Sequence, residues 1–279
     1  MCELLAMSAS RPSGVGHYLS RLMARGGRTG PHVDGWGVAY YEDRAVRIFK
    51  EPAPAADSRL LAMLAEDPFT STALIAHIRL ANPSIFGRAT GNTHPFEREW
   101  NGRSWVFAHN GKLSGLHKKS CRPDSRFLPL GETDSELAFC HILEAVVRGI
   151  GRDGRFSPAK LVDTIRPVVV ELATFGEFNF ILSDGECLYA HAHTNLHVLQ
   201  RTLSTKGDGL KMILLATAPL TAEPWRAMAP GSIHVYRQGE EVLRARHAAR
   251  PAKYRPTAQR CADVTSPLEL AGLGRRAAA

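Results

Sequence analysis

Signals for export and for membrane insertion are missing from this sequence of 279 residues. There is no run of about 18 apolar residues, so neither a transmembrane helix nor an association with a membrane is expected. The opening residues, Met1-Cys2-Glu3-Leu4-Leu5, have neither the basic segment nor the apolar stretch of a secretory signal. These absences predict a cytoplasmic protein.

Cysteine is also scarce, with five residues and no Cys-X-X-Cys spacing. This odd, scattered set argues against a disulfide framework and against a four-cysteine zinc site, and reduced thiols fit the cytoplasm. His191 and His193 alternate along a predicted strand and would face the same side. Because no third ligand lies at a useful spacing, we expect no metal. The glycine-rich stretch around Asp34-Gly35-Trp36-Gly37 has neither phosphate-loop nor Gly-X-Gly-X-X-Gly spacing, and no cofactor is expected.

The net charge of +8 lies mostly at one end of the chain. Residues 244–279 carry eight Lys or Arg and two Asp or Glu, which leaves +2 for residues 1–243. The basic segment has few aromatic side chains on which bases could stack, so nucleic-acid binding is not predicted. We expect residues 244–279 to form a basic, partly disordered extension, the alternative being a binding arm.

Short runs typical of strands dominate residues 1–243 and often follow one another without a helix between them. This arrangement favours antiparallel pairing and an α+β domain of stacked layers. The predicted strands are Leu4–Met7, Gly37–Tyr41, Val46–Lys50, Ala73–Ile78, Ser104–Ala108, Phe178–Ser183, Cys187–Ala192, Met212–Thr217 and Ile233–Tyr236.

Helices are fewer. Helical spacing occurs at Gly16–Ala24, at Ser58–Ala65 and from Asp134 to about Arg148. Thr133 and Glu136 have the spacing of a capping box at the start of the last of these. Another helix begins at Ser157-Pro158, and Pro167 is expected to interrupt or kink it.

Cys2 is the first candidate for chemistry. Removal of Met1, which is common before a small residue, would leave a thiol and a free α-amine on one residue. An α-amine with a pKa near ~8 can accept the thiol proton. The resulting thiolate attacks an amide carbon far better than a thiol does. The alternative is a small buried residue that opens the first strand.

Two charged residues could hold the head of an amino acid. Arg79 follows an apolar strand, where its guanidinium can bind a carboxylate through two parallel hydrogen bonds. Its alternative role is an ion pair with a structural Asp or Glu. Asp134 lies in the first turn of a predicted helix and could hold an ammonium group. A carboxylate is also favourable there for the helix alone.

An oxyanion site is indicated by His109-Asn110-Gly111, which follows a predicted strand. The Asn110 side-chain amide and the Gly111 backbone N–H are two donors that can stabilise a tetrahedral intermediate. The alternative is an Asn-Gly turn between strands.

Two further motifs could line a ligand site. The glycines of Asp34-Gly35-Trp36-Gly37 allow close approach of the backbone to a ligand, or form a turn with Trp36 packed on the core. In Asn92-Thr93-His94-Pro95-Phe96, His94 could act as a base or orient a substrate. It could equally be a loop histidine held by the adjacent proline.

Taken in order along the chain, these motifs resemble the class II glutamine amidotransferase family, which has the N-terminal-nucleophile (Ntn) hydrolase fold. More narrowly, they are similar to its stand-alone YafJ-type bacterial members. The resemblance covers about residues 1–243, which are expected to form one amidotransferase-type domain, and nothing is carried over to residues 244–279. The segments that carry it are residues 1–8, 30–37, 94–96, 131–136, 178–185, 194–197 and 216–221.

The resemblance implies a four-layer αββα sandwich of two antiparallel sheets. It implies that Cys2 is the nucleophile and that its own amine is the base. Asn110 and the Gly111 N–H match the oxyanion hole of the family. Arg79 and Asp134 match the residues that bind the α-carboxylate and α-ammonium of glutamine.

Thr93, His94 and Trp36 lie in the matched motifs and are expected at the substrate site. Trp36 stands where the better-known biosynthetic members have a small residue, which leaves the pocket size and the substrate open.

The expected reaction is cysteine-dependent hydrolysis of the side-chain amide of glutamine or of a γ-glutamyl compound, through a γ-glutamyl thioester. One alternative is a glutaminase subunit that delivers ammonia to a separate synthase partner. Another is a non-catalytic binding or regulatory protein of the same fold. Loss of Cys2, Asn110 or Asp134 would have favoured the last, and all three residues are present. A homodimer is compatible with the sequence and is not indicated by it.

Overall fold

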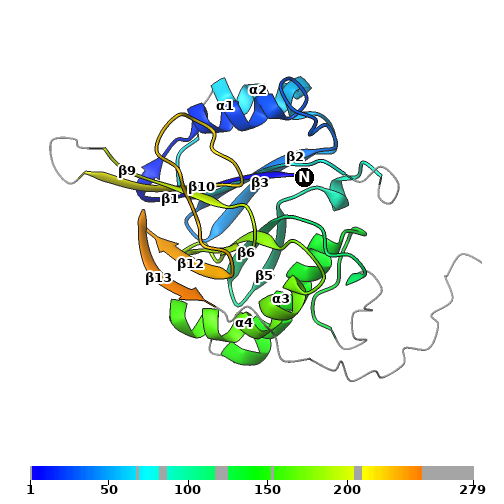
Figure 1. The fold of residues 1–279 in the computed structure, drawn as a ribbon, viewed down its shortest axis with the longest axis vertical. Helices are drawn as coiled ribbons and strands as arrows, with labels where there is room; N and C mark the ends of the chain where they lie inside the picture. The colour runs from blue at the N-terminus through cyan, green and yellow to red at the C-terminus, as the bar shows by residue number, and fades with distance from the viewer. Residues whose placement is uncertain are drawn as a thin grey trace, which may run out of the picture.

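Two antiparallel sheets form the centre of the protein (Figure 1). The computed structural model describes residues 2–66, 69–81, 87–116, 125–151, 154–203 and 209–246. Within these residues the first sheet has seven strands in the order β11-β9-β10-β1-β4-β2-β3, and the second has six in the order β13-β12-β8-β7-β6-β5.

The strands of the first sheet are β1 (Glu3–Ser13), β2 (Trp36–Glu42), β3 (Ala45–Glu51), β4 (Ser71–Ile78), β9 (His197–Leu203), β10 (Leu210–Ala216) and β11 (Arg226–Ala227). Those of the second are β5 (Phe96–Trp100), β6 (Arg103–Asn110), β7 (Asn179–Ser183), β8 (Leu188–Ala192), β12 (Ser232–Arg237) and β13 (Glu240–Arg246).

Helices cover the outer face of each sheet (Figure 1). The helices α1 (Gly16–Arg25) and α2 (Arg59–Glu66) lie on the first sheet, whereas α3 (Asp134–Ile150) and α4 (Pro158–Ala173) lie on the second. Short 3-10 turns occur at Ala55–Asp57 and Thr90–Asn92. The α+β class and the four αββα layers that the resemblance implied are confirmed. None of the helices in the described ranges is long and apolar enough to cross a membrane.

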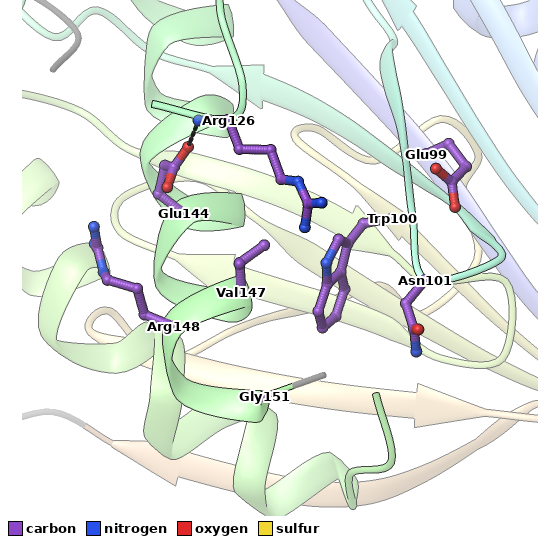
Figure 2. A pocket seen from close by; sticks show the side chains of 8 residues that line it. All are labelled: Glu99, Trp100, Asn101, Arg126, Glu144, Val147, Arg148 and Gly151. Atoms are coloured by element: carbon purple, nitrogen blue, oxygen red, sulfur yellow. Dashed lines mark hydrogen bonds between the residues drawn. The ribbon is translucent and has the colours of Figure 1, made fainter. Parts of the chain in front are cut away.

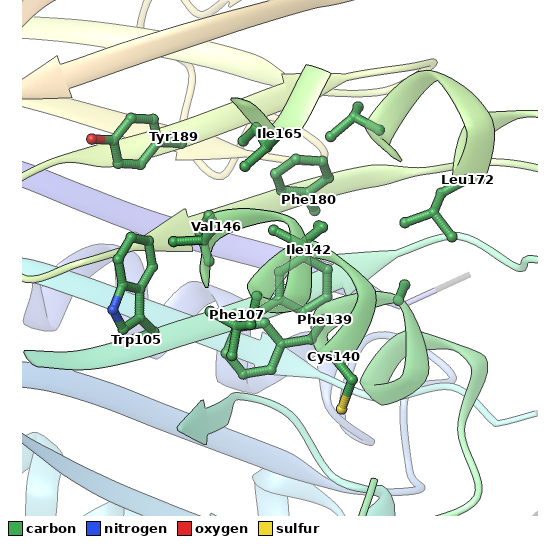
Figure 3. Packing of buried hydrophobic residues seen from close by; sticks show 14 of the residues in the cluster. Trp105, Phe107, Phe139, Cys140, Ile142, Val146, Ile165, Leu172, Phe180 and Tyr189 are labelled. Carbon is green, nitrogen blue, oxygen red and sulfur yellow. The ribbon is translucent and has the colours of Figure 1, made fainter. Parts of the chain in front are cut away.

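Three apolar clusters fill the spaces between the four layers. One lies between α1, α2 and the first sheet, and a second lies between the two sheets. The third joins the second sheet to α3 and α4 and is drawn in Figure 3. In it, Phe107 of β6 stacks on Phe139 of α3 with ring centroids 5.2 Å apart. These clusters explain why the strands are apolar on both faces.

Strict alternation of side chains decides which cluster each residue joins. In β1, Leu4 packs between the sheets, whereas Leu5 packs under α1 and α2. In β6, Phe107 faces α3 and Ala108 faces the first sheet. Successive side chains of a strand point to opposite faces, so a strand's register fixes both sets at once.

The predicted strands and helices are present, but four strands were not predicted, namely the two-residue β11 and three longer strands. The three longer strands are β5, β9 and β13, which are richer in charged and polar residues than the others. They gain their backbone hydrogen bonds from β6, β10 and β12, which the local sequence does not reveal. Strand β13 continues to Arg246, beyond the predicted domain boundary at residue 243. Residues 247–279 lie outside the described part of the chain.

The predicted cap of α3 is confirmed on one side, because the Thr133 hydroxyl accepts a hydrogen bond from the Glu136 amide at 3.2 Å. The Glu136 carboxylate does not complete a capping box. It accepts instead from the amides of Leu130 and Gly131 and pairs with Arg98 at 2.5 Å. Arg98 therefore ties β5 to the first turn of α3.

Of the interruption or kink predicted at Pro167, the interruption is wrong, because α4 runs through this residue. Ile165 and Val169, on either side of it, are buried against the second sheet. Their packing holds the helix together across the missing N–H of the proline.

Ile181 tests the layer between the two sheets, since its side chain is fully buried there. Ile181→Ala should lower the free energy of unfolding by ~2–5 kcal/mol, because it leaves a cavity. Val242→Ala is the control, since Val242 is 41% exposed on β13, and it should change stability by no more than ~0.5 kcal/mol. Urea denaturation measures both, and equal losses would contradict the assignment of this core.

Candidate active site

The ends of several strands meet around Cys2. Glu3 pairs with Ile78 in the β1–β4 register, so Cys2 lies beside the residues that follow β4. The Leu80 amide donates to Cys2 Sγ at 3.4 Å, and Sγ lies 3.6 Å from the Leu80 carbonyl oxygen. From the other sheet, Asn110 at the end of β6 donates its side-chain amide to the Cys2 carbonyl oxygen. The two sheets are thus joined by hydrogen bonds at Cys2.

The surroundings of the Cys2 thiol act on its pKa in opposite directions. Burial raises the pKa, whereas the Leu80 amide, the N-terminal charge and Arg79 lower it, and the net effect is a raised pKa. A thiol with a raised pKa is protonated at neutral pH. Because the thiolate is the nucleophile, this cysteine needs a nearby base to react.

Arg79 is a buried cation with few partners. Its residue is 4% exposed, and its backbone bonds to Gly35 at 2.7 Å and to Asp34 at 3.1 Å hold it in place. The guanidinium Nη1 donates to the Asp34 carbonyl oxygen at 3.4 Å. The ion pairs among the described residues do not include Arg79. A buried charge without a counter-ion is costly, so this position is suited to an anionic ligand group.

Asn110 is held by a residue that sequence reasoning missed. Asn179 of β7 is its direct cross-strand partner and is fully buried. The Asn179 amide nitrogen lies 3.3 Å from the Asn110 carbonyl oxygen and 3.5 Å from Asn110 Oδ1. Its own oxygen accepts from three successive amides, those of residues 193–195. An asparagine inside the apolar run Phe178–Ser183 is the signal that could have revealed it.

Gly111 lies where no other residue fits. Its φ of 149° is in the region that favours glycine. A Cβ atom at this position would overlap the Glu177 carbonyl oxygen. The backbone after β6 can therefore pass close to Glu177 only because residue 111 has no side chain.

Asp134 is the first residue of α3, where the helix dipole favours a carboxylate. Its Oδ2 accepts a hydrogen bond from the Leu113 amide at 2.6 Å. Its Oδ1 lies 3.3 Å from the Ser135 hydroxyl, which in turn lies 2.8 Å from His109 Nδ1. His109 and Ser135 had no predicted role, since their spacing in the sequence gives no sign that they meet.

Thr93 and His94 are buried next to the start of β2. The Thr93 hydroxyl donates to the Ala89 carbonyl oxygen at 2.9 Å, so its proton is already in use. The His94 ring packs on His77, with centroids 4.2 Å apart, and neither ring nitrogen of His94 has a hydrogen-bond partner among the described residues. Burial lowers the pKa of His94 well below its usual value, so the ring is neutral.

The Trp36 side chain points away from Cys2. It is 1% exposed, packs in the cluster under α1 and α2, and donates to Glu51 at 3.0 Å. Trp36 pairs with Ile78, and both side chains lie on the face of the first sheet that α1 and α2 cover. Leu4, two residues from Cys2, lies on the opposite face, toward the other sheet. The Trp36 side chain therefore packs on the core, which was its alternative role, and it does not lie beside Cys2.

The two histidines considered as metal ligands bond to the backbone of one residue. His191 Nδ1 lies 2.6 Å from the Phe178 carbonyl oxygen, and His193 Nδ1 accepts from the Phe178 amide at 3.1 Å. Within the described ranges, no cluster of three or more His, Cys, Asp or Glu side chains is arranged to hold a metal.

A large surface hollow lies elsewhere on the molecule, between the β5–β6 turn and α3 (Figure 2). It encloses about 820 Å³, and Trp100 and Val147 line it together with charged side chains of both signs. None of the predicted site residues contributes to it. The candidate site is therefore identified by its chemical groups and not by a large cavity.

Comparison with known proteins identifies the family of this chain. Residues 1–207 match the family model described as glutamine amidotransferases class-II. This chain belongs to the class II glutamine amidotransferase family. Membership places it among proteins that hydrolyse the amide of glutamine, as the order of its motifs predicted.

Full-length relatives of the family are similar over most of the chain. "Putative glutamine amidotransferase YafJ" of Escherichia coli (strain K12) is 38% identical over 87% of this chain and 100% of its own length. "Putative glutamine amidotransferase" of Haemophilus influenzae is 35% identical over 87% of this chain and 86% of its own.

Solved structures of the family share the fold. A predicted glutamine amidotransferase from Pseudomonas aeruginosa PA01 superposes with a TM-score of 0.64 at 33% identity, over 87% of this chain and all of its own. The glutamine phosphoribosylpyrophosphate amidotransferase of B. subtilis has a TM-score of 0.60 at 17% identity, over 89% of this chain and 50% of its own. At that identity, the likeness shows the fold alone.

Gly111→Ala tests the close approach after β6. The new Cβ combines left-handed backbone strain with the overlap at Glu177, so the free energy of unfolding should fall by ~2 kcal/mol or more. Gly115→Ala is the matched control, because Gly115 has a φ of 86° and open space around it. It should cost about 1 kcal/mol from strain alone. Equal effects in thermal or urea unfolding would refute the overlap.

Proposed function

We propose that this amidotransferase-family protein hydrolyses the side-chain amide of glutamine or of a γ-glutamyl compound through a γ-glutamyl thioester on Cys2. The observation that carries the proposal is Arg79, a buried guanidinium without a carboxylate partner among the described residues, beside the Cys2 thiol. A substrate α-carboxylate would supply the missing counter-ion. Asp134, whose Oδ1 has no backbone donor in the described part, would take the α-ammonium.

Removal of Met1 precedes the reaction and exposes the α-amine of Cys2. The amine takes the thiol proton, and the thiolate attacks the γ-carbonyl carbon. Asn110 Nδ2, which already reaches Cys2, and the Gly111 N–H would stabilise the oxyanion. The ammonium formed on Cys2 then gives its proton to the leaving nitrogen as the C–N bond breaks. Water hydrolyses the thioester, which releases glutamate and restores the thiol.

Besides substrate and water, the reaction requires only groups of this chain, namely side chains, the α-amine of Cys2 and a backbone N–H, and no metal or organic cofactor takes part in it. It needs a reduced Cys2, which fits the cytoplasm. Delivery of ammonia to a separate synthase is the alternative, and it differs in the fate of the leaving nitrogen. Turnover of γ-glutamyl dipeptides by the isolated protein would favour hydrolysis, whereas a strict preference for glutamine would favour ammonia delivery.

The nucleophile is tested by mass spectrometry of the intact protein, before and after 6-diazo-5-oxo-L-norleucine, a glutamine-shaped electrophile. We expect loss of Met1 and one covalent adduct, on Cys2. The Cys2→Ala variant should form no adduct. A retained Met1, or an unmodified Cys2 under conditions that label a known glutaminase, would reject the catalytic proposal and favour a binding role.

Arg79→Met tests the carboxylate site. Loss of a buried charge pair costs about 2 kcal/mol or more, so kcat/KM for glutamine should fall at least ~30-fold, mainly through KM. The free energy of unfolding should stay the same or rise, because an unpaired buried charge is removed. Arg79→Lys is the control that keeps the charge without the bidentate geometry, and its loss should be smaller. An unchanged KM, or a large loss of stability in Arg79→Met, would assign Arg79 a structural role.

A further inference from the structure

A chain of hydrogen bonds leads from the proposed ammonium site to a buried histidine. Asp134 Oδ1 lies 3.3 Å from Ser135 Oγ, and Ser135 Oγ lies 2.8 Å from His109 Nδ1. On its other side, His109 Nε2 lies 3.0 Å from the Glu177 carbonyl oxygen. His109 and Ser135 are 1% and 5% exposed, so bulk water does not replace these partners.

Alternation along β6 explains how this histidine reaches the helix layer. Asn110 faces the first sheet and bonds to Cys2, whereas His109, one residue earlier, faces the first turn of α3. The two neighbours therefore serve different parts of the site. Asn110 lies at the nucleophile, and His109 lies behind the carboxylate of Asp134.

The proton on each group of this hydrogen-bond chain follows from what its partner can donate or accept. A carbonyl oxygen only accepts, so the bond to Glu177 requires a proton on His109 Nε2. Burial lowers the pKa of His109, although the charge of Asp134 opposes this, so the ring is neutral and Nδ1 carries no proton. Nδ1 must then accept, and Ser135 must donate to it. Ser135 has a single hydroxyl proton, so it cannot also donate to Asp134.

The two carboxylate oxygens of Asp134 consequently differ. Oδ2 is held by the Leu113 amide at 2.6 Å, which fixes the orientation of the carboxylate. Oδ1 faces a hydroxyl oxygen whose proton is committed to His109. Oδ1 is thus left without a hydroxyl donor and can accept from a ligand.

We infer that His109 is a positioning residue for substrate binding: by accepting the Ser135 proton, it keeps Asp134 Oδ1 open for the α-ammonium of the substrate. This inference rests on the proposed function, in which Asp134 binds that ammonium. If residue 109 had no acceptor at the position of Nδ1, the Ser135 hydroxyl would donate to Asp134 Oδ1 instead, where it would compete with the substrate.

Two substitutions separate the roles of the two ring nitrogens. His109→Gln places an amide nitrogen near the position of Nε2, which retains the Glu177 bond but removes the acceptor for Ser135. KM for glutamine should rise about tenfold, with kcat changed less than ~3-fold, because one hydrogen bond to the ammonium is weakened. His109→Asn places an oxygen near Nδ1 and retains the acceptor, so its KM should rise less than that of His109→Gln.

A double variant supplies the decisive comparison. In His109→Gln/Ser135→Ala no hydroxyl remains to compete for Asp134 Oδ1, so KM should fall back to that of Ser135→Ala alone. Such non-additivity is expected of residues that act through one another. A double variant with KM as high as that of His109→Gln, or higher, would overturn the inference, because a merely structural role of His109 predicts no recovery.

The ring tautomer provides a readout that does not depend on turnover. In Cys2→Ala protein labelled with ¹⁵N-histidine, His109 should show a protonated Nε2 and an unprotonated Nδ1. The signals that disappear in the spectrum of His109→Gln are those of His109, which assigns them among the 12 histidines. A protonated Nδ1 would overturn the inference whatever the protein does. An inactive wild type would reject the proposed function, whereas an active wild type with unchanged KM in His109→Gln would reject only this inference.

Discussion

The packing of one antiparallel sheet against the other is the interaction on which the rest of this structure depends. Each strand sends alternate side chains into the layer between the sheets and the remaining ones toward the helices. A shift of one residue in any central strand would exchange both sets, so the register is strongly determined. The positions at which the strands end follow from that register, and the candidate site is built at those ends.

The site uses both faces of the second sheet at a single point. Asn110 turns toward the first sheet and reaches Cys2, and its neighbour His109 turns toward α3 and reaches Ser135. Gly111 follows, at a position where a side chain would overlap the Glu177 carbonyl oxygen. The end of β6 thus places the proposed oxyanion donor on one face of the sheet and a support for the proposed ammonium site on the other.

The buried polar groups of the site are of two kinds, which differ in whether the protein satisfies their hydrogen bonds. Asn179 and His109 have their hydrogen bonds satisfied by the protein, so they rigidify the groups that they hold. Arg79 and His94 are buried with few partners among the described residues. Such groups lower stability unless a ligand completes them, and they are typical of binding sites in otherwise well-satisfied interiors.

The sequence by itself determined the family and the α+β class, and it supplied the residues proposed to carry the chemistry, because Cys2, Arg79, Asn110 and Asp134 lie in local motifs whose order is distinctive. Only the tertiary structure decided which way Trp36 points and which partners hold the site. Strands such as β5 and β13 form because a neighbouring strand supplies their hydrogen bonds. The contacts of His109 with Ser135 and of Asn110 with Asn179 join residues 26 and 69 positions apart. Such pairings depend on strand register and helix docking, which no local pattern encodes.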